Sequence, residues 1–185
     1  FVEFSGNQNA VDEQMDYLKE ICEDNQCVGF EIGMTTEERE QVWKARQVAH
    51  DTIKFSHPGW RQISGDVCVP ISRFTEMVEF THELSEREGV ALYVFGHAGD
   101  GNVHTDMVVP PDDAERFATA MRVLDAIVDR ALAVGGTTAG EHGIGLGKRH
   151  FMAQEHGASL GWMRAIKGLI DPNGIMNPDK IFPES

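Results

Sequence analysis

Two apolar segments, residues 90–95 and 103–109, flank a glycine-rich stretch and constrain the fold more than any other feature of this sequence. Both segments are rich in the β-branched and aromatic residues that favour strands. The stretch between them, residues 96–102, consists mostly of Gly, Asp and Asn, which suit tight turns. Consecutive strands joined by so short a turn pair in the antiparallel sense, so the sequence predicts a β-hairpin.

The rest of the chain alternates between helical and extended patterns. Apolar residues spaced three and four apart indicate helices at residues 10–24, 36–50, 72–89, 111–135 and 160–170. Short apolar runs indicate further strands at residues 1–5, 27–32 and 66–70. Residues 51–64 show no clear period and are interpreted as a loop. Helices that alternate with strands, together with a hairpin, favour an α+β fold with a mixed or antiparallel sheet covered by helices.

Capping residues indicate where two of these helices begin. Thr35 followed by Glu38 forms the capping-box pattern, and Ser72 is expected to cap the next helix through its hydroxyl. Gly89 and Gly135 are expected to end the helices that precede them, because glycine readily adopts the left-handed conformation of a helix C-terminus.

The charge balance excludes several classes of protein. The 16 Lys and Arg are outnumbered by 30 Asp and Glu, whereas nucleic acids and anionic membranes are bound through Lys and Arg.

No apolar run approaches the roughly 20 residues needed to cross a bilayer. The three irregularly spaced cysteines are expected to be reduced thiols in a cytoplasmic protein. The chain begins without Met, in what resembles the middle of a strand, so we expect a fragment of a longer polypeptide.

Two histidines mark the ends of the predicted hairpin strands. His97 closes the first strand and His104 opens the second. In a symmetric hairpin they are directly opposed, with Cβ atoms about 5 Å apart, which is close enough to share a metal ion. The alternative interpretation is a pair of half-buried histidines that only hydrogen-bond to loop carbonyls.

A second glycine-rich stretch, residues 139–147, places a carboxylate beside an imidazole, Glu141 and His142. Glu141 is a candidate third metal ligand, leaving other coordination positions open to water or substrate as in catalytic sites. His142 is a candidate acid or base, because imidazole titrates near neutral pH. Taken alone, the pair is better interpreted as a solvated part of a glycine-rich loop; the hairpin with His97 and His104 favours the functional interpretation.

Two nucleotide-binding motifs are absent from the sequence. Gly147–Lys148 resembles the end of a phosphate-binding loop, but Arg149 stands where Ser or Thr is required, and no dinucleotide fingerprint follows a predicted strand. Neither ATP nor NAD is therefore indicated.

Arg46 offers a planar guanidinium suited to a carboxylate, with His50 one helical turn further on. The alternative is an ordinary surface arginine.

Five segments together resemble the C-terminal domain of FAD-linked oxidases, the family of cytochrome-type D-lactate dehydrogenase, the glycolate oxidase flavin subunit and D-2-hydroxyglutarate dehydrogenase. They are residues 43–46, 66–70, 96–104, 140–145 and 171–178, and they occur in the family's order. The resemblance implies that residues 1–185 form a ferredoxin-like, substrate- and metal-binding cap domain. It also implies that an FAD-binding domain precedes it in the full protein.

The resemblance also implies roles for single residues. His97, His104 and Glu141 would hold a divalent metal (Zn, Mn or Fe) that engages a 2-hydroxy acid. His142 would take the hydroxyl proton while the α-hydrogen leaves as hydride to the flavin N5 atom. The substrate would be bound through Arg46 and His50, and the FAD would be contacted by Asn177.

Departures from the 2-hydroxyglutarate enzymes bear on the substrate. His50 replaces a substrate-binding Thr, Ser64 replaces a Lys and Asp106 replaces an Asn, which favours a lactate- or glycolate-like monocarboxylate. The implied electron acceptor is a cytochrome, a quinone or an electron-transfer protein, which would bring the full-length protein to the periphery of the respiratory membrane. A homodimer is an open alternative. Two rival functions remain from the residues alone, a metal-dependent hydrolase and a non-catalytic binding module.

Overall fold

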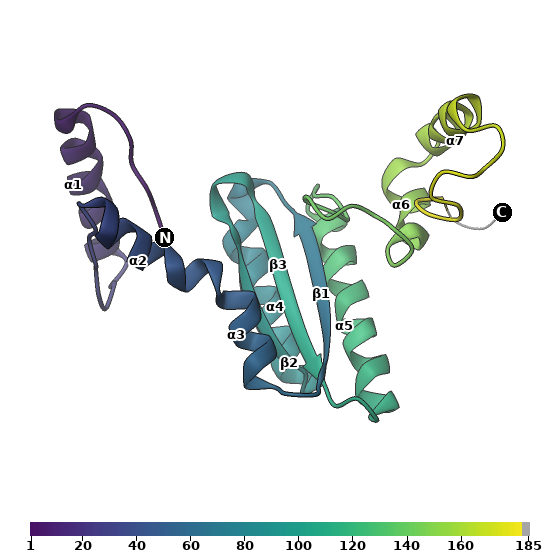
Figure 1. Ribbon diagram of the computed structural model, residues 1–185, viewed down its shortest axis with the longest axis horizontal. Helices are drawn as coiled ribbons and strands as arrows, with labels where there is room; N and C mark the ends of the chain where they lie inside the picture. Colours follow the sequence, from purple (N-terminus) through teal and green to yellow (C-terminus); the bar gives the residue numbers. More distant parts are fainter. Residues whose placement is uncertain (183–185) are drawn as a thin grey trace. The chain divides into compact units, whose positions relative to one another are not determined.

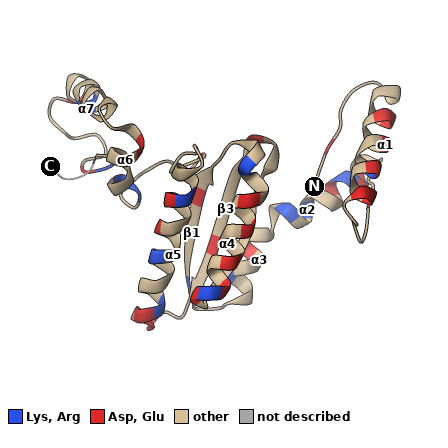
Figure 2. Cartoon of the chain, turned by 180° about the vertical axis from the view of Figure 1, so that it is seen from behind, with Lys and Arg blue, Asp and Glu red and all other residues tan. Residues whose placement is uncertain are grey.

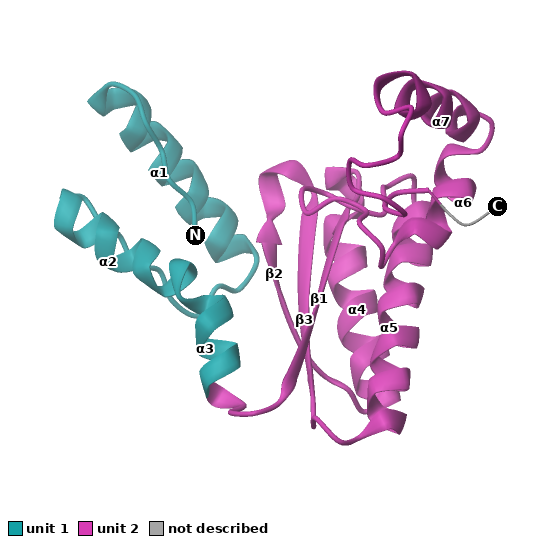
Figure 3. Ribbon diagram, turned by 45° about the vertical axis from the view of Figure 1, so that its right-hand side comes forward, with its two compact units in different colours: residues 1–55 teal, residues 56–185 magenta. Residues whose placement is uncertain are grey.

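The computed structural model of the chain describes residues 1–182, which fall into two compact units (Figure 3). The first unit, residues 1–55, contains α1 (Gln8–Asp24), α2 (Thr36–Gln47) and most of α3 (Ala49–Ser56). The second unit begins at Ser56 and contains the sheet and the remaining helices. The predicted α+β class, with an antiparallel sheet covered by helices, is confirmed.

Local side-chain hydrogen bonds explain where the helices of the first unit begin. The Asn7 side chain accepts the N–H of Ala10 at the start of α1. The predicted capping box of α2 is confirmed, because Thr35 and Glu38 exchange side-chain-to-backbone hydrogen bonds. The predicted helix 36–50 is interrupted at Val48, and α3 then extends into the segment interpreted from its sequence as a loop.

The strands predicted at residues 1–5 and 27–32 are wrong: neither segment adopts strand conformation in the structure. Their apolar residues fit the strand pattern, but a strand is stabilised by hydrogen bonds to a neighbour. The described part of the chain pairs neither segment with another strand.

The sheet consists of β1 (Arg61–Cys68), β2 (Ala91–His97) and β3 (Asn102–Val109) in the order β1-β3-β2, with both pairings antiparallel. The hairpin of β2 and β3 is confirmed, and its turn is a short 3₁₀ segment, η2 (Ala98–Asp100). The strand predicted at residues 66–70 begins earlier, at Arg61. A single antiparallel bridge, Cys68 to Thr137, extends the free edge of β1, in the position of the fourth strand of a ferredoxin-like fold.

Helices α4 (Phe74–Glu88) and α5 (Ala114–Ala133) lie side by side on one face of the sheet (Figure 1). Their sheet-facing residues are apolar, and charged residues lie along their outer sides (Figure 2). The predicted end of α4 is confirmed, with Gly89 in the left-handed conformation (φ 64°). The predicted cap is wrong: the N-cap residue is Arg73, and Ser72 belongs to the preceding 3₁₀ turn, η1 (Ile71–Arg73).

All eight residues of β3 are buried, but its two faces differ in chemistry. Val103, Met107 and Val109 join the core cluster formed with α4 and α5. Because side chains alternate along a strand, Asn102, His104 and Asp106 point to the opposite face. The sheet therefore has one apolar face that packs against helices and one face that carries polar side chains.

A C-terminal segment follows the second glycine-rich stretch. It contains η3 (Arg149–Phe151), α6 (Met152–His156) and α7 (Ser159–Ile170); the sequence pattern predicts α7 but not α6. Phe151 and Met152 are buried and attach the segment to the rest of the unit. Within residues 1–182, none of the helices combines the length and the apolar character needed to span a membrane.

Candidate metal centre

The structure brings His97, His104 and Glu141 together on the polar face of the sheet. Glu141 Oε1 lies 3.0 Å from His104 Nε2 and 3.7 Å from His97 Nε2. One potential ligand atom from each residue lies within 4.8 Å of the other two. Two imidazole nitrogens and a carboxylate oxygen form a donor set that suits Zn, Mn or Fe.

The two histidines are diagonal neighbours, not directly opposed as the symmetric hairpin predicts. In the β2–β3 register His97 faces Asn102, and His104 faces Phe95. The difference arises because the turn closes on the His97–Asn102 pair, two residues before His104. The imidazole centroids are nevertheless 5.4 Å apart, since diagonal side chains on one face remain within reach.

A buried carboxylate on β1, that of Asp66, places the backbone of Glu141 and His142. Asp66 Oδ2 accepts the N–H of Glu141 (2.9 Å) and the N–H of His142 (2.8 Å). Its other oxygen, Oδ1, lies 3.5 Å from His104 Nδ1. Burial raises the pKa of Asp66, but the two N–H donors, the positive charge of Lys148 and the electrostatic influence of His142 outweigh it, and the net shift is downward. Asp66 is therefore held as a carboxylate.

His104 is buried (6% exposed), and its environment favours the neutral imidazole. Desolvation is the largest influence and lowers its pKa; the carboxylates of Asp66 and Glu141 raise it, the imidazoles of His142 and His97 lower it, and the net shift is downward. A metal-binding histidine must be neutral, so this environment suits a ligand.

His142, the proposed base, lies beside the cluster and remains accessible. Its Nε2 atom is 3.4 Å from Glu141 Oε1, and its side chain is 62% exposed. The centroid of its ring is 5.1 Å from that of His104. It also forms a second potential metal-binding group with Asp66 and His104.

The loop that carries Glu141 and His142 is fixed close to both of its ends. The buried Lys148 Nζ donates hydrogen bonds to the carbonyl oxygens of Asp66 and Thr138. The Glu155 carboxylate accepts hydrogen bonds from the hydroxyls of Thr137 (2.6 Å) and Thr138 (2.7 Å) and from the Thr138 N–H (3.0 Å). Burial lowers the pKa of Lys148, because charging its amine in the protein interior is unfavourable.

A glycine is required at position 140, where this loop crosses the sheet. A Cβ atom there would lie 2.3 Å from Asn102 Nδ2 and 2.9 Å from Asp66 Oδ1. Only a residue without a side chain allows the loop backbone to approach the sheet so closely.

Sequence reasoning assigns no role to three residues that hold the cluster together, Asp66, Lys148 and Glu155. In the sequence, Lys148 stands out only as part of a failed phosphate-binding motif, and Asp66 only as the first residue of a predicted strand that is also one of the five segments of the family resemblance. Their importance depends on contacts between residues distant in sequence, such as the pairing of Asp66 with His104 across β1 and β3. The signal available in the sequence is an acidic residue at the start of an apolar run, Asp66 before Val67, Cys68 and Val69.

The remaining predicted site residues lie outside this cluster or in the other unit. Arg46 is in the last turn of α2 and His50 in the first turn of α3, both in the first compact unit. Asn177 lies in the C-terminal tail, with φ 46°, and accepts a hydrogen bond from Lys180 Nζ (3.0 Å). The roles of these three residues stay predictions.

Two residues that differ from the 2-hydroxyglutarate enzymes contact each other on β1 and β3. The Ser64 hydroxyl donates to Asp106 Oδ1 at 2.6 Å. Asp106 is two residues beyond His104 on the same strand, so both side chains lie on the polar face of the sheet. Asp106 is 1% exposed.

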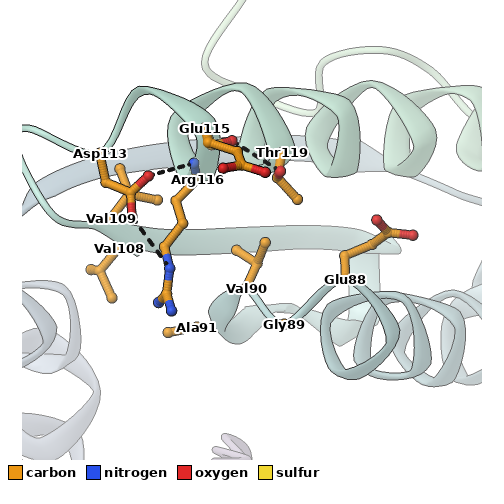
Figure 4. Close-up of a pocket in the computed structure, with 10 residues that line it drawn as sticks. All are labelled: Glu88, Gly89, Val90, Ala91, Val108, Val109, Asp113, Glu115, Arg116 and Thr119. Atoms are coloured by element: carbon orange, nitrogen blue, oxygen red, sulfur yellow. Dashed lines mark hydrogen bonds and ion pairs between the residues drawn. The ribbon is translucent and has the colours of Figure 1, made fainter.

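A separate surface pocket of about 410 Å³ lies toward the other end of the sheet (Figure 4). Arg116 extends from α5 across it toward Ala91 and is paired with Asp113, 3.4 Å away. Glu88 and Glu115 also line this pocket. With an excess of carboxylates and its arginine already paired with Asp113, this pocket is poorly suited to an organic acid.

Comparisons with known proteins identify a family and several relatives that this chain resembles over nearly its whole length. The family model described as "FAD linked oxidases, C-terminal domain" matches residues 1–181. The chain is 36% identical to a probable mitochondrial D-lactate dehydrogenase of Danio rerio, over 98% of this chain and 37% of the relative. It is 37% identical to the mitochondrial D-lactate dehydrogenase (cytochrome) 1 of Saccharomyces cerevisiae, over 94% of this chain and 30% of the relative.

A solved structure supports the fold. The 4-ethylphenol oxidase of Gulosibacter chungangensis superposes with a TM-score of 0.61 over 97% of this chain and 38% of the oxidase, at 16% identity. The chain thus spans about a third of the length of the proteins that it matches.

Proposed function

This chain belongs to the family of FAD-linked oxidase C-terminal domains, and from that membership we propose that it is the substrate- and metal-binding domain of an FAD-dependent 2-hydroxy-acid dehydrogenase. The proposed substrate is a small D-lactate- or glycolate-like acid. Because the chain spans 37% of the length of the Danio rerio relative, we assign FAD binding mainly to a domain outside these residues.

The observation that carries the proposal is the convergence of His97, His104 and Glu141 beside the exposed His142. When bound, a divalent cation would lower the pKa of the substrate hydroxyl, and FAD would accept the hydride from the carbon that bears this hydroxyl. The two histidines and Glu141 would hold the cation. Nε2 of His142, 3.4 Å from Glu141 Oε1, would accept the hydroxyl proton as a general base.

Substrate recognition would use charge on both sides of the reacting carbon. Arg46 would bind the substrate carboxylate in a bidentate manner, with His50 beside it. Asp106, a buried carboxylate on the same face as His104, would disfavour a second carboxylate on the substrate. This arrangement supports a monocarboxylate.

The C-terminal segment supports contact with the flavin-binding part of the protein. Helix α7 exposes Trp162, Ile166 and Leu169, with Trp162 76% exposed, and exposed apolar patches of this kind mark interaction surfaces. The adjoining tail would bring Asn177 to the FAD. The electron acceptor would be a cytochrome, a quinone or an electron-transfer protein, used in the cytoplasm or at the periphery of the respiratory membrane. The assembly could be a homodimer.

The test is anaerobic reduction of the flavin in the full-length protein that contains this chain. D-Lactate or glycolate should bleach the flavin absorbance, and His142→Ala should slow that step by about 10²–10⁴-fold, the usual worth of a general base. Absence of flavin reduction by any 2-hydroxy acid would overturn the proposal. Metal-dependent ester hydrolysis by the isolated chain would favour the hydrolase instead.

A further inference from the structure

We propose that Asp66 is a positioning residue that keeps the proton of His104 on Nδ1 and so leaves Nε2 free to bind the metal. The inference rests on the proposed metal centre but concerns Asp66, a residue outside the proposed ligand set of His97, His104 and Glu141. It starts from the two nitrogens of His104, which face two different carboxylates. Nε2 is 3.0 Å from Glu141 Oε1, and Nδ1 is 3.5 Å from Asp66 Oδ1.

The two oxygens of Asp66 have different surroundings. Oδ2 accepts two backbone N–H groups, those of Glu141 and His142. Oδ1 is buried and has no hydrogen-bond partner among the described residues. An unpartnered buried carboxylate oxygen is unfavourable, and a proton on the adjacent His104 Nδ1 would relieve it after a shift of a few tenths of an ångström. The orphaned oxygen therefore favours the tautomer that carries its proton on Nδ1, and Glu141 Oε1, 3.0 Å from Nε2, competes for this proton only until a cation lies between them.

The surroundings of this contact exclude water as an alternative donor. Asp66 and His104 are 4% and 6% exposed. Gly140 packs directly over Asp66, because a Cβ atom there would lie 2.9 Å from Oδ1. Carboxylate–histidine–metal arrangements of this kind fix both the tautomer and the orientation of a ligand.

One carboxylate would thus organise the whole cluster. Through Oδ2 it places the backbone of one proposed ligand, Glu141, and of the proposed base, His142. Through Oδ1 it selects the donor atom of a second ligand, His104. The inner edge of the metal centre is therefore set by a residue on β1 that does not itself need to touch the metal.

Asp66→Asn separates these two functions of the carboxylate. The two N–H donors require an acceptor, so the amide oxygen must take the place of Oδ2, and the amide NH₂ must then face His104 Nδ1. An NH₂ group donates and cannot accept. His104 is then forced to carry its proton on Nε2, while the loop keeps its hydrogen bonds.

The first measurement is the protonation of each His104 nitrogen by ¹⁵N NMR of the 185-residue chain without metal, in a Glu141→Ala background, because Glu141 Oε1 lies 3.0 Å from Nε2 and would itself accept a proton there. We expect the proton on Nδ1 in Glu141→Ala and on Nε2 in Glu141→Ala/Asp66→Asn. The second measurement is the affinity for Zn²⁺ and for Mn²⁺ by calorimetric titration, which we expect to be about 10–100-fold lower in Asp66→Asn than in the wild type.

Asp171→Asn is the matched control. Asp171 is also a buried carboxylate that accepts two successive backbone N–H groups, those of Ile175 and Met176. It lies outside the histidine cluster, so its replacement should leave the His104 tautomer and the metal affinity unchanged. Thermal unfolding of all these proteins shows whether each is folded.

A proton on Nε2 of His104 in the Glu141→Ala protein overturns the inference, and this result does not depend on Asp66→Asn being folded. A folded Asp66→Asn protein with unchanged metal affinity also overturns it. Failure of the proposed metal function gives a different result: the wild type then binds neither Zn²⁺ nor Mn²⁺, while the tautomer measurement still supports or contradicts the role of Asp66.

Discussion

Asp66 Oδ2 accepts the backbone N–H of His142, a residue 76 positions later in the chain, at 2.8 Å. This hydrogen bond joins a strand to a loop that has no helix or strand of its own at that point. The position of the proposed base is therefore determined by β1 and not by the loop's own conformation. The histidine cluster and the contacts that hold this loop can each be tested by substitution.

The metal centre predicts a defined stoichiometry. The purified chain should bind about one equivalent of Zn²⁺ or Mn²⁺, and His97→Ala/His104→Ala should bind none, because one remaining carboxylate is a weak site. Metal analysis after dialysis measures both. His82→Ala, which removes an exposed histidine of α4, should retain the metal. Equal metal content in the parent and the double variant would exclude these ligands.

The buried lysine predicts a loss of stability. Lys148→Met leaves the buried carbonyl groups of Asp66 and Thr138 without their donor, which should lower the free energy of unfolding by about 2 kcal/mol. Urea denaturation measures the change. Lys180→Met is the comparison, since Lys180 also donates to a carbonyl oxygen, that of the Asn177 side chain, but at an exposed position. It should cost less than about 1 kcal/mol, because water can replace the lost donor. Equal costs would refute the burial argument.

The close approach at Gly140 predicts opposite effects of the same substitution at two glycines. Gly140→Ala would place Cβ 2.3 Å from Asn102 Nδ2, and the resulting strain should destabilise the protein by about 1–3 kcal/mol. A Cβ atom added at Gly161, in α7, would meet nothing within 4 Å beyond the backbone of its own helix. Gly161→Ala should therefore stabilise the helix by about 0.5–1 kcal/mol. Differential scanning calorimetry should show Tm shifts of opposite sign.

Glu155 predicts a pH dependence of stability. Burial raises the pKa of Glu155, but the hydrogen bonds from Thr137 and Thr138 lower it. The net shift is downward, so the pKa in the folded protein lies below 4.5. A carboxyl with a depressed pKa contributes stability that is present above its unfolded-state pKa and is lost as the pH falls through the folded one.

Accordingly, Glu155→Gln should be less stable than the parent by about 1–2 kcal/mol near neutral pH. The difference should shrink as the pH falls below about 4.5. Unfolding curves at a series of pH values measure this. A difference that stays constant across the acid range would show that the charge of Glu155 contributes nothing.

Asp106 predicts substrate selectivity in the full-length enzyme. Asp106→Asn removes a buried negative charge from the face that carries His104, while the amide oxygen can still accept the Ser64 hydroxyl. The ratio of kcat/KM for a 2-hydroxy dicarboxylate to that for D-lactate should rise about tenfold, equivalent to roughly 1.4 kcal/mol. Steady-state kinetics with both acids measure it, and an unchanged ratio would remove Asp106 from substrate discrimination.

The hairpin and its two histidines could be predicted from the sequence because their signals are local. Strand residues, turn glycines and the histidines all fall within residues 90–109. The exact register could not be predicted, since the short 3₁₀ turn pairs His97 with Asn102 and shifts His104 along the partner strand. The Thr35 capping box was predictable for the same reason, because both of its residues lie in one helical turn.

The contacts that complete the site could not be predicted from local patterns. The hydrogen bonds that link Asp66 to Glu141, His142 and Lys148 join residues that are 75 to 82 positions apart. The two false strands, residues 1–5 and 27–32, show the same limit in reverse: an extended pattern becomes a strand only when another strand is available to pair with it.

The alternation along β3 also has a consequence for how such a domain can diverge. Its odd-numbered positions, such as Val103 and Met107, pack in the core against the helices, whereas its even-numbered positions, such as His104 and Asp106, face the proposed site. Substrate preference can therefore drift at the even positions while the scaffold is conserved at the odd ones. A saturation library of this strand, scored separately for folding and for turnover, should yield two interleaved tolerance profiles with a period of two residues.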